Sequence, residues 1–119
     1  MLVVFANNQV IVAAASLSAT IYTDPVPLGG NDRATPVTNI HAIFNAAAAG
    51  LDWIMEMSND GQTWVPQGPV SGALTTEGAT PQTPALVTGV YARLKITFTA
   101  SSAGMGAAIF DIHVNFDHA

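Results

Sequence analysis

The chain has 119 residues, no cysteine and a formal net charge of −5, and only 9% of its residues are Asp, Glu, Lys or Arg. A domain of this length can bury a core without disulfides, and the lack of cysteine excludes thiolate metal sites and cysteine nucleophiles. Three basic side chains cannot form the positive surface that nucleic acids or anionic membranes require, so neither is expected as a partner.

The low charge density also bears on the surface of the protein. An average soluble domain is about one quarter charged residues, and a monomer that must stay soluble alone usually carries more charge than this chain does. The sequence leaves two interpretations open: an ordinary β domain with a neutral surface, or a surface that neighbouring subunits cover. We adopt the second as the working hypothesis.

Residues 1–9 are expected to form a flexible N-terminal arm, followed by one domain over residues 10–119. No Lys or Arg precedes Arg33, whereas a signal peptide begins with positive charge. Asn7, Asn8 and Gln9 interrupt the apolar run too early for a segment that could span a bilayer. We therefore expect no targeting segment.

The next part of the chain alternates apolar and polar residues with a period of two, which predicts β-strands. Residues 10–22 form one long strand or two short ones, with a short helix near residues 13–15 as the alternative. Residues 24–36 contain three prolines and a Gly-Gly pair and are predicted to be a loop. In the strand predicted at 37–46, Ile40, Ala42 and Phe44 share a face, and residues 46–50 form a linker.

The middle of the chain predicts a β-hairpin. Residues 51–58 alternate so that Leu51, Trp53, Met55 and Met57 share a face, which places Trp53 in the core. The following Asn59-Asp60-Gly61 provides residues that tolerate the left-handed backbone of a tight reversal. The returning strand is predicted to begin at Gln62, with Trp64 just past the turn.

The last part of the chain holds a long loop and two clear strands. Residues 66–86 contain four prolines and three glycines, which predicts a Pro/Gly-rich loop rather than a central strand. Residues 89–100 and 107–116 alternate strictly and are predicted to be strands. Six to eight short strands without a long amphipathic helix predict an all-β fold, an antiparallel β-sandwich or jelly roll.

Few residues offer catalytic chemistry, and we expect no enzyme, no catalytic residue and no cofactor. No nucleophile elbow, phosphate-binding loop or dinucleotide fingerprint occurs in the sequence. The possible metal ligands are better interpreted as an outward polar row at a frayed end, and the acidic Gly-Gly loop as turn-forming residues, because neither has a metal-site spacing. These residues are His41, Asp111, His113, Asp117 and His118 for the row, and Asp24, Asn31 and Asp32 for the loop.

Aromatic and basic side chains provide the candidate binding residues: Trp64, Tyr91 and Arg93. Trp64 lies by a turn with polar neighbours, and an exposed aromatic face can stack on a sugar. Arg93 and Lys95 are also expected to form cross-strand ion pairs with Asp52, Glu56 or Asp111.

The stretches WIMEMSNDGQTWVP and VTGVYARLKITFT also carry a resemblance to known families. A strand ending in Ser58-Asn59-Asp60-Gly61, the following Trp64 and the later Tyr91-x-Arg93-Leu94 resemble small β-sandwich virion proteins of tailed bacteriophages, including head decoration (cement) proteins. The Ser-Asn-Asp-Gly-x-x-Trp turn is similar to that of discoidin-like domains.

The resemblance to virion proteins implies a function and a set of partners. It implies a decoration protein that binds the phage head surface through neutral loops and the N-terminal arm, after synthesis in the host cytoplasm. Its partners would be the major capsid protein and copies of itself, as a trimer or another homo-oligomer. The alternative is a tail-associated or carbohydrate-binding module that binds a glycan at Trp64.

Overall fold

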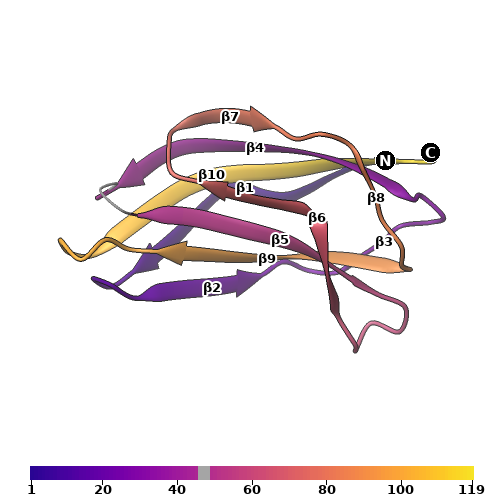
Figure 1. The fold of residues 1–119 in the computed structure, drawn as a ribbon, viewed down its shortest axis with the longest axis horizontal. Coiled ribbons are helices and arrows are strands. Elements are labelled where there is room, and N and C mark those ends of the chain that lie inside the picture. The colour runs from indigo at the N-terminus through magenta and orange to yellow at the C-terminus, as the bar shows by residue number, and fades with distance from the viewer. Residues whose placement is uncertain (46–48) are drawn as a thin grey trace.

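The computed structural model describes residues 1–45 and 49–119, which form ten strands in two antiparallel sheets packed as a sandwich (Figure 1). The first sheet has the order β1 (Leu2–Ala13), β10 (Gly106–Asp117), β4 (Arg33–Phe44), β7 (Gly78–Pro81), with β8 (Ala85–Leu86) also paired to β4. The second has the order β2 (Ser18–Tyr22), β9 (Tyr91–Thr99), β5 (Gly50–Ser58), β6 (Val65–Leu74), with β3 (Val26–Pro27) also paired to β9.

The eight longest strands pair in a nested order. β1 pairs with β10, β2 with β9, β4 with β7, and β5 with β6. A chain folded into one long hairpin and then rolled up produces this nesting, which is the winding of a jelly roll. The prediction of an antiparallel β-sandwich is confirmed, with ten strands instead of six to eight because β3 and β8 are only two residues long.

The core lies between the sheets and consists of every second residue of the long strands. The alternation predicted for residues 89–100 and 107–116 is confirmed, because every second residue of β9 and β10 is fully buried. The predicted core position of Trp53 is also confirmed, because Leu51, Trp53, Met55 and Met57 of β5 are at most 3% exposed. Each large apolar side chain buried in this way contributes about 1.5–3 kcal/mol. The buried rows are Ala92, Leu94, Ile96 and Phe98 of β9, and Phe110, Ile112, Val114 and Phe116 of β10.

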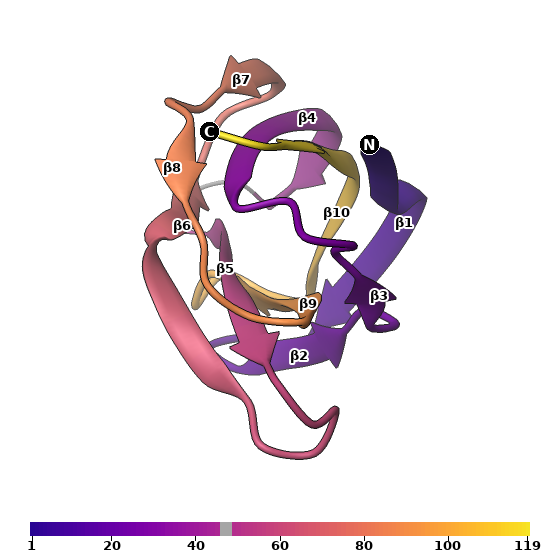
Figure 2. The same cartoon turned by 90° about the vertical axis from the view of Figure 1, so that its right-hand side faces the viewer.

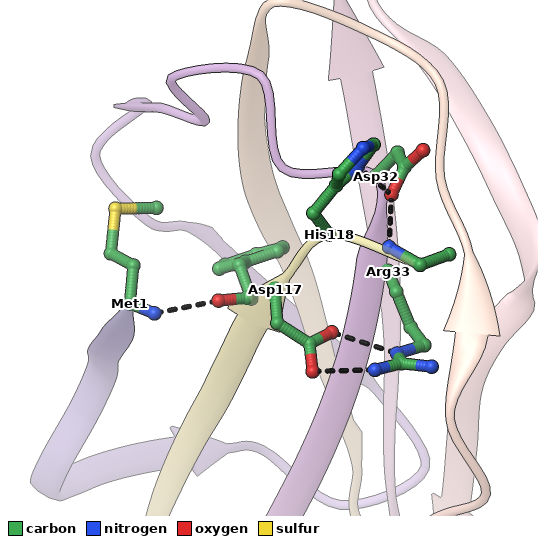
Figure 3. Close-up of polar contacts among 7 residues, drawn as sticks. Met1, Asp32, Arg33, Asp117 and His118 are labelled. Atoms are coloured by element: carbon green, nitrogen blue, oxygen red, sulfur yellow. Dashed lines mark hydrogen bonds and ion pairs between the residues drawn. The ribbon is translucent and has the colours of Figure 1, made fainter.

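The predicted N-terminal arm is wrong, because β1 begins at Leu2 and pairs with β10. The Met1 amino group donates to the Phe116 carbonyl at 2.6 Å (Figure 3). The Phe116 amide also donates to the Met1 carbonyl, at 2.7 Å. The residues that interrupt the apolar run form a β-bulge: the register shifts between Ala6 and Gln9, and Asn8 has a φ of +47°. A bulge inserts residues into a strand without ending it.

The predicted loops contain further strands. Residues 66–86 include most of β6 together with β7 and β8, so the prediction of a long loop there is wrong. β6 and β7 are the last strands of their sheets, and proline is tolerated at a sheet edge because an outward-facing position needs no N–H donor. Residues 24–36 likewise include β3 and the start of β4. Residues 10–22 contain the end of β1 and the whole of β2, so the predicted alternative of two strands is confirmed.

A second bulge reverses the orientation of residues at the end of β4. Ile40 pairs with Phe110 but Ala42 pairs with Ile109, so His41 is an extra residue in β4. Ile43 therefore packs against the core, and Phe44, which was predicted to share a face with Ile40, is 54% exposed. Residues 46–48 of the predicted linker lie outside the described residues.

No helix in the described ranges is both long and apolar enough to cross a membrane.

Candidate functional site

The β5–β6 connection is organised by Asp60 and extends away from the body of the sandwich (Figure 2). Asp60 Oδ1 accepts hydrogen bonds from the amides of Gln62 and Thr63, both at 2.8 Å, and from Ser58 Oγ at 2.9 Å. The amides of Thr63 and Gln62, and then the Ser58 hydroxyl, lower the pKa of Asp60 to about 2. Gly61 has a φ of +76°, which glycine adopts at little cost.

The predicted hairpin is thus confirmed, but its connection is longer than a tight turn. β5 ends at Ser58 and β6 begins at Val65, so the Ser-Asn-Asp-Gly sequence starts a six-residue loop over residues 59–64. Trp64 is the last residue of this loop rather than part of the returning strand. Its ring lies on the outer face of the second sheet.

On that face the guanidinium of Arg93 lies between two aromatic rings. Arg93 Cζ is 4.3 Å from the ring centroid of Trp64 and 4.6 Å from that of Tyr22. Arg93 Nε also donates to Glu56 Oε1 at 2.8 Å, from the directly opposite position on β5. Cation–π contacts of this kind contribute about 0.5–1 kcal/mol each at exposed sites and more when desolvated. We call Trp64, Arg93, Tyr22 and Glu56 the arginine cluster.

The structure therefore brings two of the three predicted binding residues, Trp64 and Arg93, into contact. Tyr91 lies two positions before Arg93 on the same face of β9 and is half-buried. Sequence reasoning missed Tyr22, which reaches the cluster because β2 pairs with β9 and places Tyr22 opposite Lys95. Only knowledge of the strand order could have found it. The ion pair expected between Arg93 and Glu56 is present.

The loop also borders a hollow of about 530 Å³, which lies on the side of the second sheet to which Met57 points and not on the outer face that carries the arginine cluster. This volume falls within the range of ligand sites in proteins. Its walls combine hydroxyl, amide and carboxylate groups with apolar side chains, and Thr63 and Val65 on its rim flank Trp64. The residues that line it are Met57, Ser58, Asn59, Asp60, Thr63, Val65, Gln67 and Thr88.

The candidate metal ligands are divided between two places. On the outer face of the first sheet, His41 Nε2 lies 2.7 Å from Asp111 Oδ2, and the Asn8 amide donates to Asp111 Oδ1 at 2.6 Å. The Asn8 amide and then the His41 ring lower the pKa of Asp111. This carboxylate therefore joins two bulges, one in β1 and one in β4.

The other place is the end of the sandwich where the termini lie (Figure 3). Asp117 accepts two hydrogen bonds from Arg33, at 2.7 and 2.8 Å, and Asp32 accepts from the Ala119 amide at 2.8 Å and contacts His118 at 3.2 Å. The pKa of Asp117 is lowered by Arg33, and that of Asp32 by the Ala119 amide and His118. Among the described residues, no three His, Asp or Glu side chains are placed to hold a metal ion.

These observations define a class of protein: a jelly-roll sandwich with an aromatic–arginine cluster at one loop. No protein-family model and no curated protein sequence matches the chain. Its structure is similar to the PBSX exported protein XepA, with a TM-score of 0.65, 9% identity, and coverage of 100% of this chain and 37% of that chain.

Two further solved structures share the fold. VP2 of an infectious bursal disease virus subviral particle has a TM-score of 0.63 at 12% identity, over 99% of this chain and 32% of that chain. TmCBM61, solved in complex with β-1,4-galactotriose, has a TM-score of 0.50 at 10% identity, over 91% of this chain and 70% of that chain. The chain spans about one third of the length of XepA and VP2. At these identities the likeness establishes the sandwich fold.

Proposed function

We propose that this chain is a structural virion protein of a tailed phage, a decoration protein that binds the major capsid protein on the head surface and copies of itself. It acts by contact alone, without catalysis or a cofactor. Jelly rolls serve repeatedly as viral capsid domains, and the fold shared with VP2 supports this assignment. Fold alone does not define function, so the proposal depends on the surface.

The single observation that carries the proposal is an exterior rich in exposed apolar side chains and poor in charge. The chain has only three basic and eight acidic residues. Large hydrophobic side chains that are at least 48% exposed occur on both sheets and in the loops; they are Met1, Leu2, Val4, Val10, Val12, Leu17, Tyr22, Phe44, Val65, Leu86, Val90 and Met105. Contiguous exposed apolar surface marks sites that bind other proteins, and such contiguity occurs where Val12 and Phe44 align through Ala107 across β1, β10 and β4.

A neutral surface suits attachment to a shell for a physical reason. Burying an ionised group costs several kcal/mol unless it is paired, whereas apolar and small neutral groups lose little when water is removed. Weak contacts repeated between neighbouring copies on a lattice then add through avidity. Because residues 2–9 belong to β1 and do not form an arm, the contacts with the capsid protein are assigned to the loops and edge strands within residues 24–36 and 66–86.

The proposal is tested by adding the purified protein to heads from a phage that lacks its gene and measuring occupancy by co-sedimentation. Leu86 and Leu17 are 65% and 60% exposed, but only Leu86 lies within the assigned contact segments. We expect saturable binding, weakened by Leu86→Lys and unchanged by Leu17→Lys. No saturable binding, or an equal loss in both variants, would contradict the proposal.

A second candidate function, glycan binding at Trp64, is favoured by the aromatic and arginine side chains that the arginine cluster brings together on the outer face of the second sheet. The shared fold with TmCBM61, a protein solved with a bound galactotriose, supports it. Aromatic faces suit sugar stacking, although Arg93 already covers one face of Trp64. A glycan array probed with the wild type and Trp64→Ala tests this candidate, with Met105→Ala, a change at a residue that is 67% exposed and outside the candidate site, as the control. Binding that is absent, or equal in all three proteins, would rule it out.

A further inference from the structure

We propose that residues Gln9–Ala13 of β1 pair antiparallel with the same segment of a second copy, forming a two-fold dimer through the edge of the first sheet. The inference rests on the self-association included in the proposed function and names the surface responsible. Its basis is the free edge of β1, the apolar rows beside it and the absence of charge along it.

β1 has one free side. It is the first strand in the order β1-β10-β4-β7, so in the described part of the chain its partner strand is β10 alone. It lies at the right-hand margin of the molecule in Figure 2. From Gln9 to Ala13 its register with β10 is unbroken. A regular edge of this kind presents backbone N–H and C=O groups that another strand can bond.

The other edges of the sandwich are blunted, whereas this segment is not. β6 contains Pro66 and Pro69 and a register shift, β7 is four residues long and ends in Pro81, and β2, β3 and β8 have five residues or fewer. Prolines, short strands and bulges are common protections against edge pairing. β1 has no proline and no charged residue, and its bulge at Asn8 leaves the second half regular.

The outer face beside this edge is apolar. Val10 and Val12 are 53% and 48% exposed, and strand pairing aligns them with apolar residues of β10 and β4. The two aligned rows contain no ionised group: Val10, Ile109 and Ala42 form one, and Val12, Ala107 and Phe44 the other. In the dimer, Val10 of one copy lies opposite Val12 of the other, so the apolar rows continue across the two-fold axis.

A second copy fits this edge for reasons of symmetry and charge. An antiparallel strand pairs with itself about a two-fold axis, so the same residues supply both sides of the contact. The net charge of −5 opposes association in general, but no charge lies within residues 2–13 to oppose it here. Five paired residues cover much less than the roughly 800 Å² per partner of a standard interface. The dimer is therefore weak and concentration-dependent.

Sedimentation equilibrium of the 119-residue protein from micromolar to millimolar concentration tests the inference. The doubly substituted Val10→Lys, Val12→Lys protein places like charges across the axis and should dimerise roughly tenfold or more weakly. Val65→Lys alters a valine of similar exposure, 60%, on β6 and should dimerise like the wild type. Thermal unfolding of all three proteins verifies that each is folded.

Hydrogen exchange locates the contact. Outward-facing amides between Gln9 and Ala13 should exchange more slowly as the wild-type concentration rises, and should not do so in the doubly substituted protein. A monomer at every concentration, an undiminished dimer in the doubly substituted protein, or protection elsewhere would overturn the inference. A protein that stays monomeric but still binds phage heads saturably would refute the dimer alone. A protein that dimerises but does not bind phage heads would refute only the proposed function.

Discussion

Replacing Gly72 by alanine should destabilise the protein because Trp53 occupies the space that the new methyl group needs. A Cβ at Gly72 would overlap Trp53 Nε1, and would lie 3.0 Å from Trp53 Cε2 and 3.3 Å from Gln82 Nε2. Trp53 is 2% exposed, so its indole has no open space to enter and β6 must shift instead. Overpacking of this kind costs about 1–3 kcal/mol. Trp53 Nε1 has no hydrogen-bond partner among the described residues, so the cost is steric.

The same strand offers a matched control in Gly68→Ala. A Cβ at Gly68 meets no atom within 4 Å. This change should therefore leave stability unchanged, or raise it by up to about 1 kcal/mol because alanine lowers the conformational entropy of the unfolded chain. Urea and thermal unfolding measure both variants, and Gly72→Ala should lower Tm by roughly 4–15 °C. A difference between the two variants of less than about 0.5 kcal/mol, the usual range for surface substitutions, would refute the packing described for Trp53.

Two further predictions concern the loop and the first strand. Asp60→Ala should speed amide exchange at Gln62 and Thr63, which lose their acceptor; unchanged rates would contradict this organisation of the loop. Because the pKa of Asp60 falls from 3.8 to about 2 on folding, its carboxylate stabilises the protein above pH 3.8 and this contribution is lost toward pH 2, so Asp60→Asn should flatten acid unfolding curves there. Deleting residues 1–9 should lower the free energy of unfolding by on the order of 3 kcal/mol, since it removes Phe5 and its edge-to-face contact with Phe116. An unchanged melting curve would contradict the pairing of this segment and support the flexible arm that the sequence predicted.

The strands that the sequence predicted correctly are those that alternate without interruption. β5, β9 and β10 each bury every second residue over most of their length. For a strand with one face in the core, this alternation is a direct consequence of the pleat. It also placed Trp53 in the core. Local pattern is sufficient where neither a bulge nor an edge intervenes.

Bulges and edges account for the errors. The bulge near Asn8 hid the continuity of β1, and the extra residue His41 reversed the orientation of Phe44. Prolines predicted a loop over residues 66–86, although edge strands accept them. Each of these features depends on which strand lies alongside, and that information is not local in the sequence.

The candidate site was predictable to the same extent. Trp64 was identifiable as an aromatic residue beside a turn, Arg93 as an outward-facing cation of a strand, and Glu56 as its cross-strand partner. Tyr22 was not identifiable, because it reaches Arg93 through the pairing of β2 with β9, strands separated by most of the chain. The possible metal ligands were grouped by strand face, with His41 joining from another strand. The structure brings His41 to Asp111, but it places Asp117 and His118 with Arg33 and Asp32 at the end of the sandwich.

The most direct test of the central claim is to locate this chain in purified phage particles. Quantitative mass spectrometry combined with cryo-electron microscopy of heads from phages with and without the gene measures both copy number and position. We expect many copies per particle, seen as added density on the outer head surface that disappears on deletion of the gene. Absence of the chain from purified particles, or a position restricted to the tail, would contradict the account.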